Sequence, residues 1–211
     1  MRLRNIKGAR ERIANEEKAM ETPKEYKGKW GQVFGNNNSI HIEIGMGKGA
    51  FITQLANENP DINFIGIEKY SSVLIRAIEK LPLVKNNNLF LIRMDAEEIE
   101  DIFEHNEVER IYLNFSDPWP KERHAKRRLT SKEFLARYHQ FLTKEGQVIF
   151  KTDNRTLFDF TLGQIAIAGW KVESVTFDLH NSKYLEGNVM TEYESKFVAL
   201  GNPINRVVIY Q

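Results

Sequence analysis

The sequence of 211 residues lacks cysteine, which excludes disulfide bonds, thiolate zinc sites and a cysteine nucleophile. It also lacks an excess of either charge, because 30 Lys and Arg stand against 29 Asp and Glu. A surface for a polyanion therefore depends on local clusters of basic residues. No run reaches the roughly 18 apolar residues of a membrane span, and Met1 to Met20 lack the apolar core of a signal peptide. We expect a cytoplasmic protein that does not enter a membrane.

Two further absences concern ligands. The five histidines show no ligand spacing with one another or with suitable carboxylates, so we expect no metal site. A phosphate-binding P-loop is missing as well, because Lys48 is followed by Gly49 and Ala50. The length and the hydrophobic content of 41% favour one domain with one core.

From about Ser39 onward, strand and helix patterns alternate. The expected strands are Ile40–Ile44, Asn63–Ile67, Leu89–Arg93, Arg110–Phe115 and Gly146–Thr152. The expected helices are Ala50–Asn57, Ser72–Leu81, Ser131–Leu142 and Asn154–Ala168. This alternation predicts an α/β fold in which helices cover both faces of a mostly parallel sheet.

The order of elements changes after Gly169. Trp170–Leu179 and Ser195–Leu200 both have strand patterns, and no helix of ordinary length is expected between them. An antiparallel hairpin at the C-terminal end of the sheet is the most economical interpretation.

The first expected strand passes directly into a loop with Gly45, Gly47 and Gly49. In open α/β sheets such a loop lets the backbone approach a nucleotide-like ligand. The spacing also satisfies the fingerprint G-x-G-x-x-A, so the loop by itself fits a nicotinamide cofactor, an adenosylmethionine-type cofactor or a purely structural turn. Glu43 favours adenosylmethionine, because a carboxylate there attracts an amino group and a sulfonium but repels a pyrophosphate.

Two more acidic residues end the following strands. Glu68 comes nineteen residues after Gly49, where a carboxylate can accept hydrogen bonds from both hydroxyls of a ribose. Asp95 ends the third strand, within reach of an adenine edge in the same crevice. A compatible alternative makes Asp95 the N-cap of a helix at residues 96–103.

The fourth strand leads into a loop that contains two prolines, Pro118 and Pro120. Because proline restricts the backbone, we predict that Asp117 and Trp119 are presented in a fixed geometry. The alternative interpretation is an ordinary turn with a helix-capping aspartate and a core tryptophan.

The residues from Asn114 to Leu129 read Asn-Phe-Ser-Asp-Pro-Trp-Pro-Lys-x-Arg-His-x-Lys-Arg-Arg-Leu. Glu-Ile-Gly-x-Gly-Lys-Gly lies upstream, and Thr-Asp-Asn and Thr-Glu-Tyr-Glu lie downstream. Together these strings resemble the bacterial tRNA (guanine-N7-)-methyltransferase family, from about Tyr26 to the C-terminus. The resemblance implies a Rossmann-like class I methyltransferase with a seven-stranded sheet. It also divides the chain into an N-terminal arm, 1–25, and one methyltransferase domain, 26–211.

The resemblance implies that S-adenosylmethionine is the methyl donor, with S-adenosylhomocysteine as product and no metal. The acceptor is N7 of a guanosine in the tRNA variable loop, position 46 of the tRNA. Carried over by position, the donor site comprises the three loop glycines and the carboxylates Glu43, Glu68, Asp95 and Asp117. The substrate-binding residues are Lys121, Asp153, Thr191, Glu192, Tyr193 and Glu194.

The implied reaction requires that the guanine and the methyl donor are aligned, and it does not require proton transfer. Guanine N7 carries an in-plane lone pair, so an in-line displacement needs no general base. Asp117 is the leading candidate for orienting the guanine and stabilising the charge that moves onto it, with Asp153 second. The stretch Thr191 to Glu194 has an alternative interpretation as a plain hairpin loop.

A basic segment follows the catalytic loop directly. Residues 121–128 contain five Lys or Arg and one Glu. We expect contacts with RNA phosphates from Arg123, His124, Lys126, Arg127 and Arg128. The alternative is a solvated helix face. Because N7 lies in the deep groove of an A-form helix, the target base should lie in a loop or be extruded.

The arm at 1–25 carries Arg2, Arg4, Lys7, Arg10 and Arg12. It fits either a mobile arm that assists tRNA capture or a simple amphipathic or frayed terminus. Two other functions compete with methyl transfer: a nicotinamide-dependent oxidoreductase and a non-catalytic RNA-binding protein with the same fold. The family includes monomers and dimers, so both states stay open.

Overall fold

The strands form where β-branched and aromatic residues cluster. The computed structural model describes residues 6–211, and its strands are β1 (Ala19–Glu21), β2 (Ile40–Ile44), β3 (Asn63–Glu68), β4 (Leu89–Arg93), β5 (Val108–Asn114), β6 (Leu142–Thr152), β7 (Lys171–Thr176) and β8 (Asn205–Tyr210). They make one sheet in the order β1-β4-β3-β2-β5-β6-β8-β7. All neighbours are parallel except β8, which runs antiparallel to both β6 and β7.

Period-two alternation sends side chains to opposite faces of the sheet, where two apolar clusters form. Along β4, Leu89 and Leu91 join one cluster, whereas Phe90 and Ile92 join the other. The expectation of helices on both faces is therefore confirmed.

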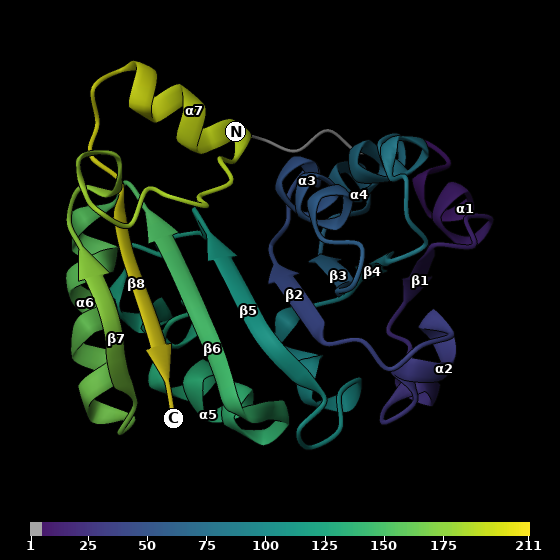
Figure 1. Ribbon diagram of the computed structural model, residues 1–211, viewed down its shortest axis with the longest axis horizontal. Helices are drawn as coiled ribbons and strands as arrows, with labels where there is room; N and C mark the ends of the chain where they lie inside the picture. Colours follow the sequence, from purple (N-terminus) through teal and green to yellow (C-terminus); the bar gives the residue numbers. More distant parts are fainter. Residues whose placement is uncertain (1–5) are drawn as a thin grey trace.

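Each face has its own set of helices. The cluster with Leu89 and Leu91 is covered by α1 (Ala9–Ala14), α3 (Ala50–Glu58) and α4 (Ser71–Ile78). The other cluster is covered by α2 (Trp30–Phe34), α5 (Lys132–Phe141) and α6 (Arg155–Ile167). Figure 1 shows α5 and α6 behind the strands β5 to β8. The short 3₁₀ helices are η1 (Lys24–Tyr26), η2 (Leu81–Leu83), η3 (Ala96–Asp101), η4 (Glu122–Arg127) and η5 (Leu179–Asn181).

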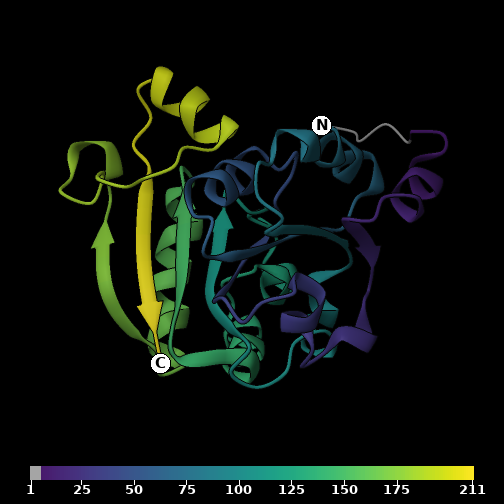
Figure 2. The ribbon, with the colours of Figure 1, turned by 45° about the vertical axis from the view of Figure 1, so that its right-hand side comes forward.

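The C-terminal pair of antiparallel strands is confirmed, but one of its strands was wrongly placed by the sequence pattern. Residues 195–200 belong mostly to a helix, α7 (Glu192–Ala199), and the last strand is β8. Thr191 caps α7 by accepting a hydrogen bond from the Glu194 amide, and Gly201 follows it in the left-handed conformation. This start signal and this stop signal outweigh the strand propensity of the residues between them. In Figures 1 and 2, α7 stands above the upper ends of β5 and β6.

Across residues 6–211 the sheet has eight strands rather than the expected seven, because β1 pairs with β4 at one edge. This strand and α1 both come from the range 1–25. Ile13 of α1 is fully buried among side chains of α4 and neighbouring elements. Arg2 and Arg4 lie outside the described residues. No helix within residues 6–211 combines the length and the apolar character that crossing a bilayer requires.

Candidate active site

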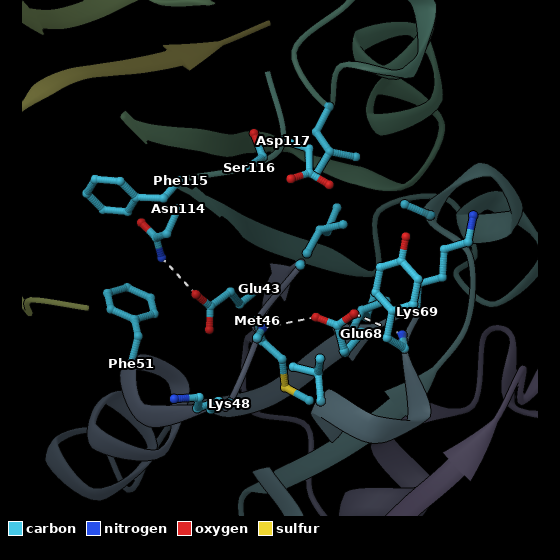
Figure 3. Close-up of a pocket in the computed structure, with 18 of the residues that line it drawn as sticks. Glu43, Met46, Lys48, Phe51, Glu68, Lys69, Asn114, Phe115, Ser116 and Asp117 are labelled. Atoms are coloured by element: carbon cyan, nitrogen blue, oxygen red, sulfur yellow. Dashed lines mark hydrogen bonds between the residues drawn. The ribbon is translucent and has the colours of Figure 1, made fainter. Parts of the chain in front are cut away.

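The site lies where the order of the sheet reverses. The chain runs from β2 outward through β3 and β4, then returns to place β5 on the other side of β2. In open parallel sheets the carboxyl ends of such neighbouring strands leave a crevice between diverging loops. A cavity of about 700 Å³ occupies this position (Figure 3). The loops after β2, β3, β4 and β5 line it, together with the first turn of α7.

The glycine loop forms the floor of the cavity. Gly45, Gly47 and Gly49 all have positive φ, at 75°, 59° and 72°, a conformation that other residues adopt with strain. A Cβ on Gly49 would lie 2.8 Å from the Cβ of Ala77, so this glycine also permits close packing of α3 on α4. Gly45 and Gly47 line the cavity, whereas Gly49 is buried at the N-cap of α3.

Glu43 lies beside this loop and is buried, with 2% of its surface exposed. Its Oε1 accepts a hydrogen bond of 2.9 Å from Asn114 Nδ2, while its Oε2 has no partner among the described residues. Burial raises the pKa of Glu43 to about 8, although the bond from Asn114 and the charge of Lys151 oppose the shift. A buried carboxylate oxygen without a partner at the wall of a cavity suits a cationic ligand.

Glu68 and Asp95 occupy the next two strand ends, as their positions predicted. Glu68 accepts hydrogen bonds from the amides of Gly47, at 3.2 Å, and Tyr70, at 2.9 Å. It therefore joins the loops after β2 and β3. Asp95 caps η3 through the Glu97 amide and pairs with Lys69. Both carboxylates line the cavity, so the capping role and the pocket position of Asp95 coexist.

The loop after β5 is held in a strained conformation. Phe115 and Trp119 have φ of 52° and 41°, each costing about 1 kcal/mol or more for a residue with a side chain. Arg128 holds the loop, because its guanidinium donates to the carbonyls of Pro118, at 3.0 Å, and Trp119, at 3.1 Å. Asp117, between the two strained residues, lines the cavity and lies across it from Glu43 in Figure 3.

The basic segment divides into two parts. Arg128 is buried, and its guanidinium lies 4.2 Å from the ring centroid of Phe160, so it serves the loop rather than the surface. His124 stacks on Trp119 with ring centroids 5.7 Å apart, and Arg127 covers the same tryptophan at 5.1 Å. The exposed cations of this segment are Lys121, Arg123, Lys126 and Arg127.

The first turn of α7 closes one side of the cavity with Thr191, Glu192 and Tyr193. Tyr193 is 63% exposed, and its ring stacks against that of Phe115, with centroids 6.4 Å apart. An exposed aromatic face at a cavity mouth is suited to stacking with a planar base. Glu192 pairs with Lys48 of the glycine loop at 3.4 Å.

Three expected substrate residues do not line the cavity. Lys121 is exposed at the end of the loop that follows β5, and Asp153 is half-buried just after β6. Glu194 is completely buried and pairs with Lys151. Sequence reasoning missed Lys151, because a lysine near the end of an apolar strand gives no signal of the partner that it meets in space. Among residues 6–211, no group of three His, Asp or Glu gathers as metal ligands.

Comparisons with known proteins agree with this geometry. Residues 37–207 match a family model described as a putative methyltransferase. The chain is 65% identical over 211 residues to a tRNA (guanine-N(7)-)-methyltransferase of Lachnoclostridium phytofermentans, covering 100% of this chain and 99% of the relative. It is 51% identical over 210 residues to the protein of that name from Bacillus subtilis, covering 99% and 98%.

Solved structures show the same fold at low identity. One is an antibiotic-related methyltransferase with a TM-score of 0.64 and 19% identity, covering 87% of this chain and 94% of that one. Another is the 16S rRNA methyltransferase KamB, with a TM-score of 0.63 and 13% identity, covering 87% and 93%. Fold, site and full-length similarity together lead to one conclusion: the chain belongs to the family of bacterial tRNA (guanine-N7-)-methyltransferases.

Proposed function

We propose that this protein transfers a methyl group from S-adenosylmethionine to N7 of a guanosine in the variable loop of tRNA. The observation that carries the proposal is the cavity at the sheet's switch point, with carboxylates on three consecutive strand ends. The names of the full-length relatives supply the acceptor, N7 of a guanine in tRNA. Its position in the tRNA, 46, is what the family resemblance implies. A protein that modifies tRNA is expected in the cytoplasm.

The residues of the cavity fit this methyl donor. Glu43 has a buried oxygen with no hydrogen-bond partner within residues 6–211, and this oxygen would accept from the donor's amino group, beside the sulfonium. Glu68 and Asp95 also line the cavity, where Glu68 would accept hydrogen bonds from the ribose hydroxyls and Asp95 would meet the adenine edge. The same arrangement disfavours a nicotinamide dinucleotide, because a cationic group favours the charged form of Glu43, whereas a pyrophosphate beside this carboxyl group would be repelled by that form. The donor supplies an activated methyl group on a positively charged sulfur.

The protein's own part in the reaction is to orient the guanine relative to the methyl group. The carbon–sulfur bond breaks as the carbon–nitrogen bond to N7 forms, and the positive charge moves onto the purine. No proton is transferred in this step, so no general base is required. Asp117 faces the cavity from the strained loop and orients the guanine while stabilising the new charge. Asp153 follows β6 at the same edge of the sheet and is the second candidate.

Binding of tRNA falls to the surface around the cavity mouth. The exposed cations of η4 and its flanks contact phosphates, and Tyr193 stacks with the extruded base. The described N-terminal cations Lys7, Arg10 and Arg12 are exposed and would assist tRNA capture through their charge.

The test is methyl transfer from labelled S-adenosylmethionine to unmodified tRNA, followed by nucleoside analysis. We expect 7-methylguanosine, and a calorimetric titration with NAD should give no signal. Another methylated nucleoside, or binding of NAD in place of the methyl donor, would overturn the proposal.

The role of Asp117 has its own prediction. Asp117→Ala should lower kcat by about 100-fold or more, because a group that acts on the transition state is lost. Its thermal midpoint should stay close to that of the wild type, since the side chain is exposed. Asp61→Ala, in an exposed turn far from the cavity, is the matched control and should keep the full rate. A near-normal rate for Asp117→Ala would remove this residue from the mechanism.

A further inference from the structure

The first turn of α7 has two sides with different roles. Thr191, Glu192 and Tyr193 line the cavity. The next residue, Glu194, points into the molecule and has no exposed surface. Its amide donates to Thr191 Oγ1 at 2.9 Å, so the cap of the helix and the buried carboxylate belong to one local unit. Whatever holds Glu194 therefore also holds the three residues that face the cavity.

The residue that holds Glu194 is Lys151, near the end of β6 and only 2% exposed. Its ammonium donates three hydrogen bonds: to Glu194 Oε2 at 2.7 Å, to the Val189 carbonyl at 2.9 Å and to Asn188 Oδ1 at 3.0 Å. Every N–H of the ammonium thus has a partner. All three partners belong to the segment that leads into α7 or to α7 itself.

The second oxygen of Glu194 is satisfied from the same segment. Oε1 accepts a hydrogen bond of 2.7 Å from Asn188 Nδ2 and lies 3.0 Å from His180 Nε2. A buried ion pair contributes little net stability, because removing two charges from water is costly. The pair instead fixes the geometry, because both charged groups have all their hydrogen-bond partners in one arrangement only. That arrangement fixes the first turn of α7 relative to β6.

The same lysine reaches toward the methyl-donor side of the cavity. Lys151 pairs in register with Asn114 of β5, and Asn114 holds Glu43. The ammonium also lies 5.1 Å from the ring centroid of Phe51, which lines the cavity. One buried cation therefore stands between the carboxylate proposed for the donor and the helix proposed for the acceptor.

We propose that Lys151 is a positioning residue for methyl transfer: through its buried pair with Glu194 it holds the first turn of α7 over the donor pocket. This inference rests on the proposed function. It assigns Glu194 to the support of the cavity wall rather than to contact with the tRNA. It also predicts a second effect of Lys151 on Glu43, exerted through its charge.

The charge effect has a defined sign. Glu43 faces Lys151 and Glu68, and the Lys151 charge lowers the pKa of Glu43 against the rise caused by burial. Lys151 itself faces Glu194, Glu43 and Arg206. His180 faces Glu194 from η5. Without the ammonium, the pKa of Glu43 rises further, so a higher pH is needed to ionise it.

The variants are Lys151→Met, Glu194→Gln and the double variant, with Lys144→Met as matched control. Lys144 lies on the same strand but is exposed at its other end. For each variant we would measure the thermal midpoint, kcat/KM for tRNA, and kcat/KM for S-adenosylmethionine between about pH 6 and pH 10. Wild-type activity on tRNA is established first, so that failure of the proposed function is seen separately.

We expect Lys151→Met and Glu194→Gln each to lower kcat/KM for tRNA by about tenfold or more at temperatures where they are folded. The double variant should be more stable than Lys151→Met, because no unpaired charge stays buried, yet equally inactive. The rise of kcat/KM for S-adenosylmethionine with pH should move to higher pH in Lys151→Met and stay in place in Lys144→Met.

Two results would overturn the proposal. One is activity that recovers together with stability in the double variant, because Lys151 would then serve folding alone. The other is a folded Lys151→Met or Glu194→Gln variant with kcat/KM for tRNA within about threefold of the wild type. If Lys151→Met does not fold, Glu194→Gln decides the question, since it keeps the shape of the side chain while removing its charge.

Discussion

At the scale of single residues, Glu43 is buried and one of its oxygens has no hydrogen-bond partner in the part of the chain that the structure describes. Its pKa of about 8 means that the free protein holds this carboxyl group mostly protonated at neutral pH. A cationic ligand beside it would favour the charged form and expel the proton. On the proposed function, Glu43 would therefore link binding of the methyl donor to pH.

We predict that binding of S-adenosylmethionine at pH 7 releases close to one proton per site. Calorimetry in buffers with different ionisation enthalpies measures this number directly. Glu43→Gln should abolish the release and weaken binding by about tenfold or more, because a charged partner of the ligand is lost. Equal proton release in the variant and the wild type would show that another group titrates.

The same group affects stability. Its pKa is raised on folding, so the unfolded chain loses the proton near pH 4.5 while the folded protein keeps it until about pH 8. Glu43 therefore costs stability progressively as pH rises through this window. Consistent with that sign, Glu43→Gln should raise the thermal midpoint at pH 8 more than at pH 5.

At the scale of elements, η4 and its flanks combine two functions in eight residues. Arg128 is buried and clamps the strained loop that carries Asp117, whereas Arg123 and Lys126 are exposed. Adjacent basic residues thus serve different purposes: Arg123 and Lys126 lie one 3₁₀ turn apart within η4, whereas Arg128 follows the end of η4 in an extended conformation.

We predict that Arg123→Ala and Lys126→Ala each weaken tRNA binding and reduce its dependence on salt. Each lost phosphate contact should lower the slope of log K against log salt by about 0.7 to 0.9. Arg128→Ala is the contrasting variant: it should lower kcat while leaving the salt slope unchanged. A filter-binding series between about 50 and 300 mM salt distinguishes the two classes. A reduced slope for Arg128→Ala would assign that residue to RNA contact instead.

At the scale of the whole molecule, the described part of the range 1–25 adds strand β1 to the sheet and helix α1 to one face of it. Ile13 is fully buried between α1 and α4. The described part of this range therefore contributes to the apolar core and brings Arg10 and Arg12 onto a folded helix.

We predict that Ile13→Ala lowers the free energy of unfolding by about 2 to 4 kcal/mol, because a fully buried side chain is cut back. Urea denaturation provides the measurement. Arg10→Ala, on the exposed side of the same helix, is the control and should change stability by less than about 0.5 kcal/mol. An unchanged stability for Ile13→Ala would mean that α1 does not contribute to the cooperative fold.

Much of the site was accessible from local patterns. Glu43 and Glu68 stand at the ends of two predicted parallel strands. Residues at the ends of parallel strands lie at the carboxyl edge of the sheet, and this position does not depend on how the rest of the chain folds. The helix α7 was misread as a strand, because apolar residues at 197, 198 and 200 fit either period when the capping residues on both sides are not weighed.

The sequence by itself determined the alternation of strands and helices, the positive-φ glycines and the acidic residues at the strand ends. These depend on side-chain periodicity and on backbone sterics over a few residues. Only the tertiary structure decided that Arg128 holds a loop, that Glu194 is buried and that Lys151 is its partner. Their roles depend on burial. Lys151 is separated from water only when β6 packs against α7, and its partner Glu194 lies 43 positions further along the chain.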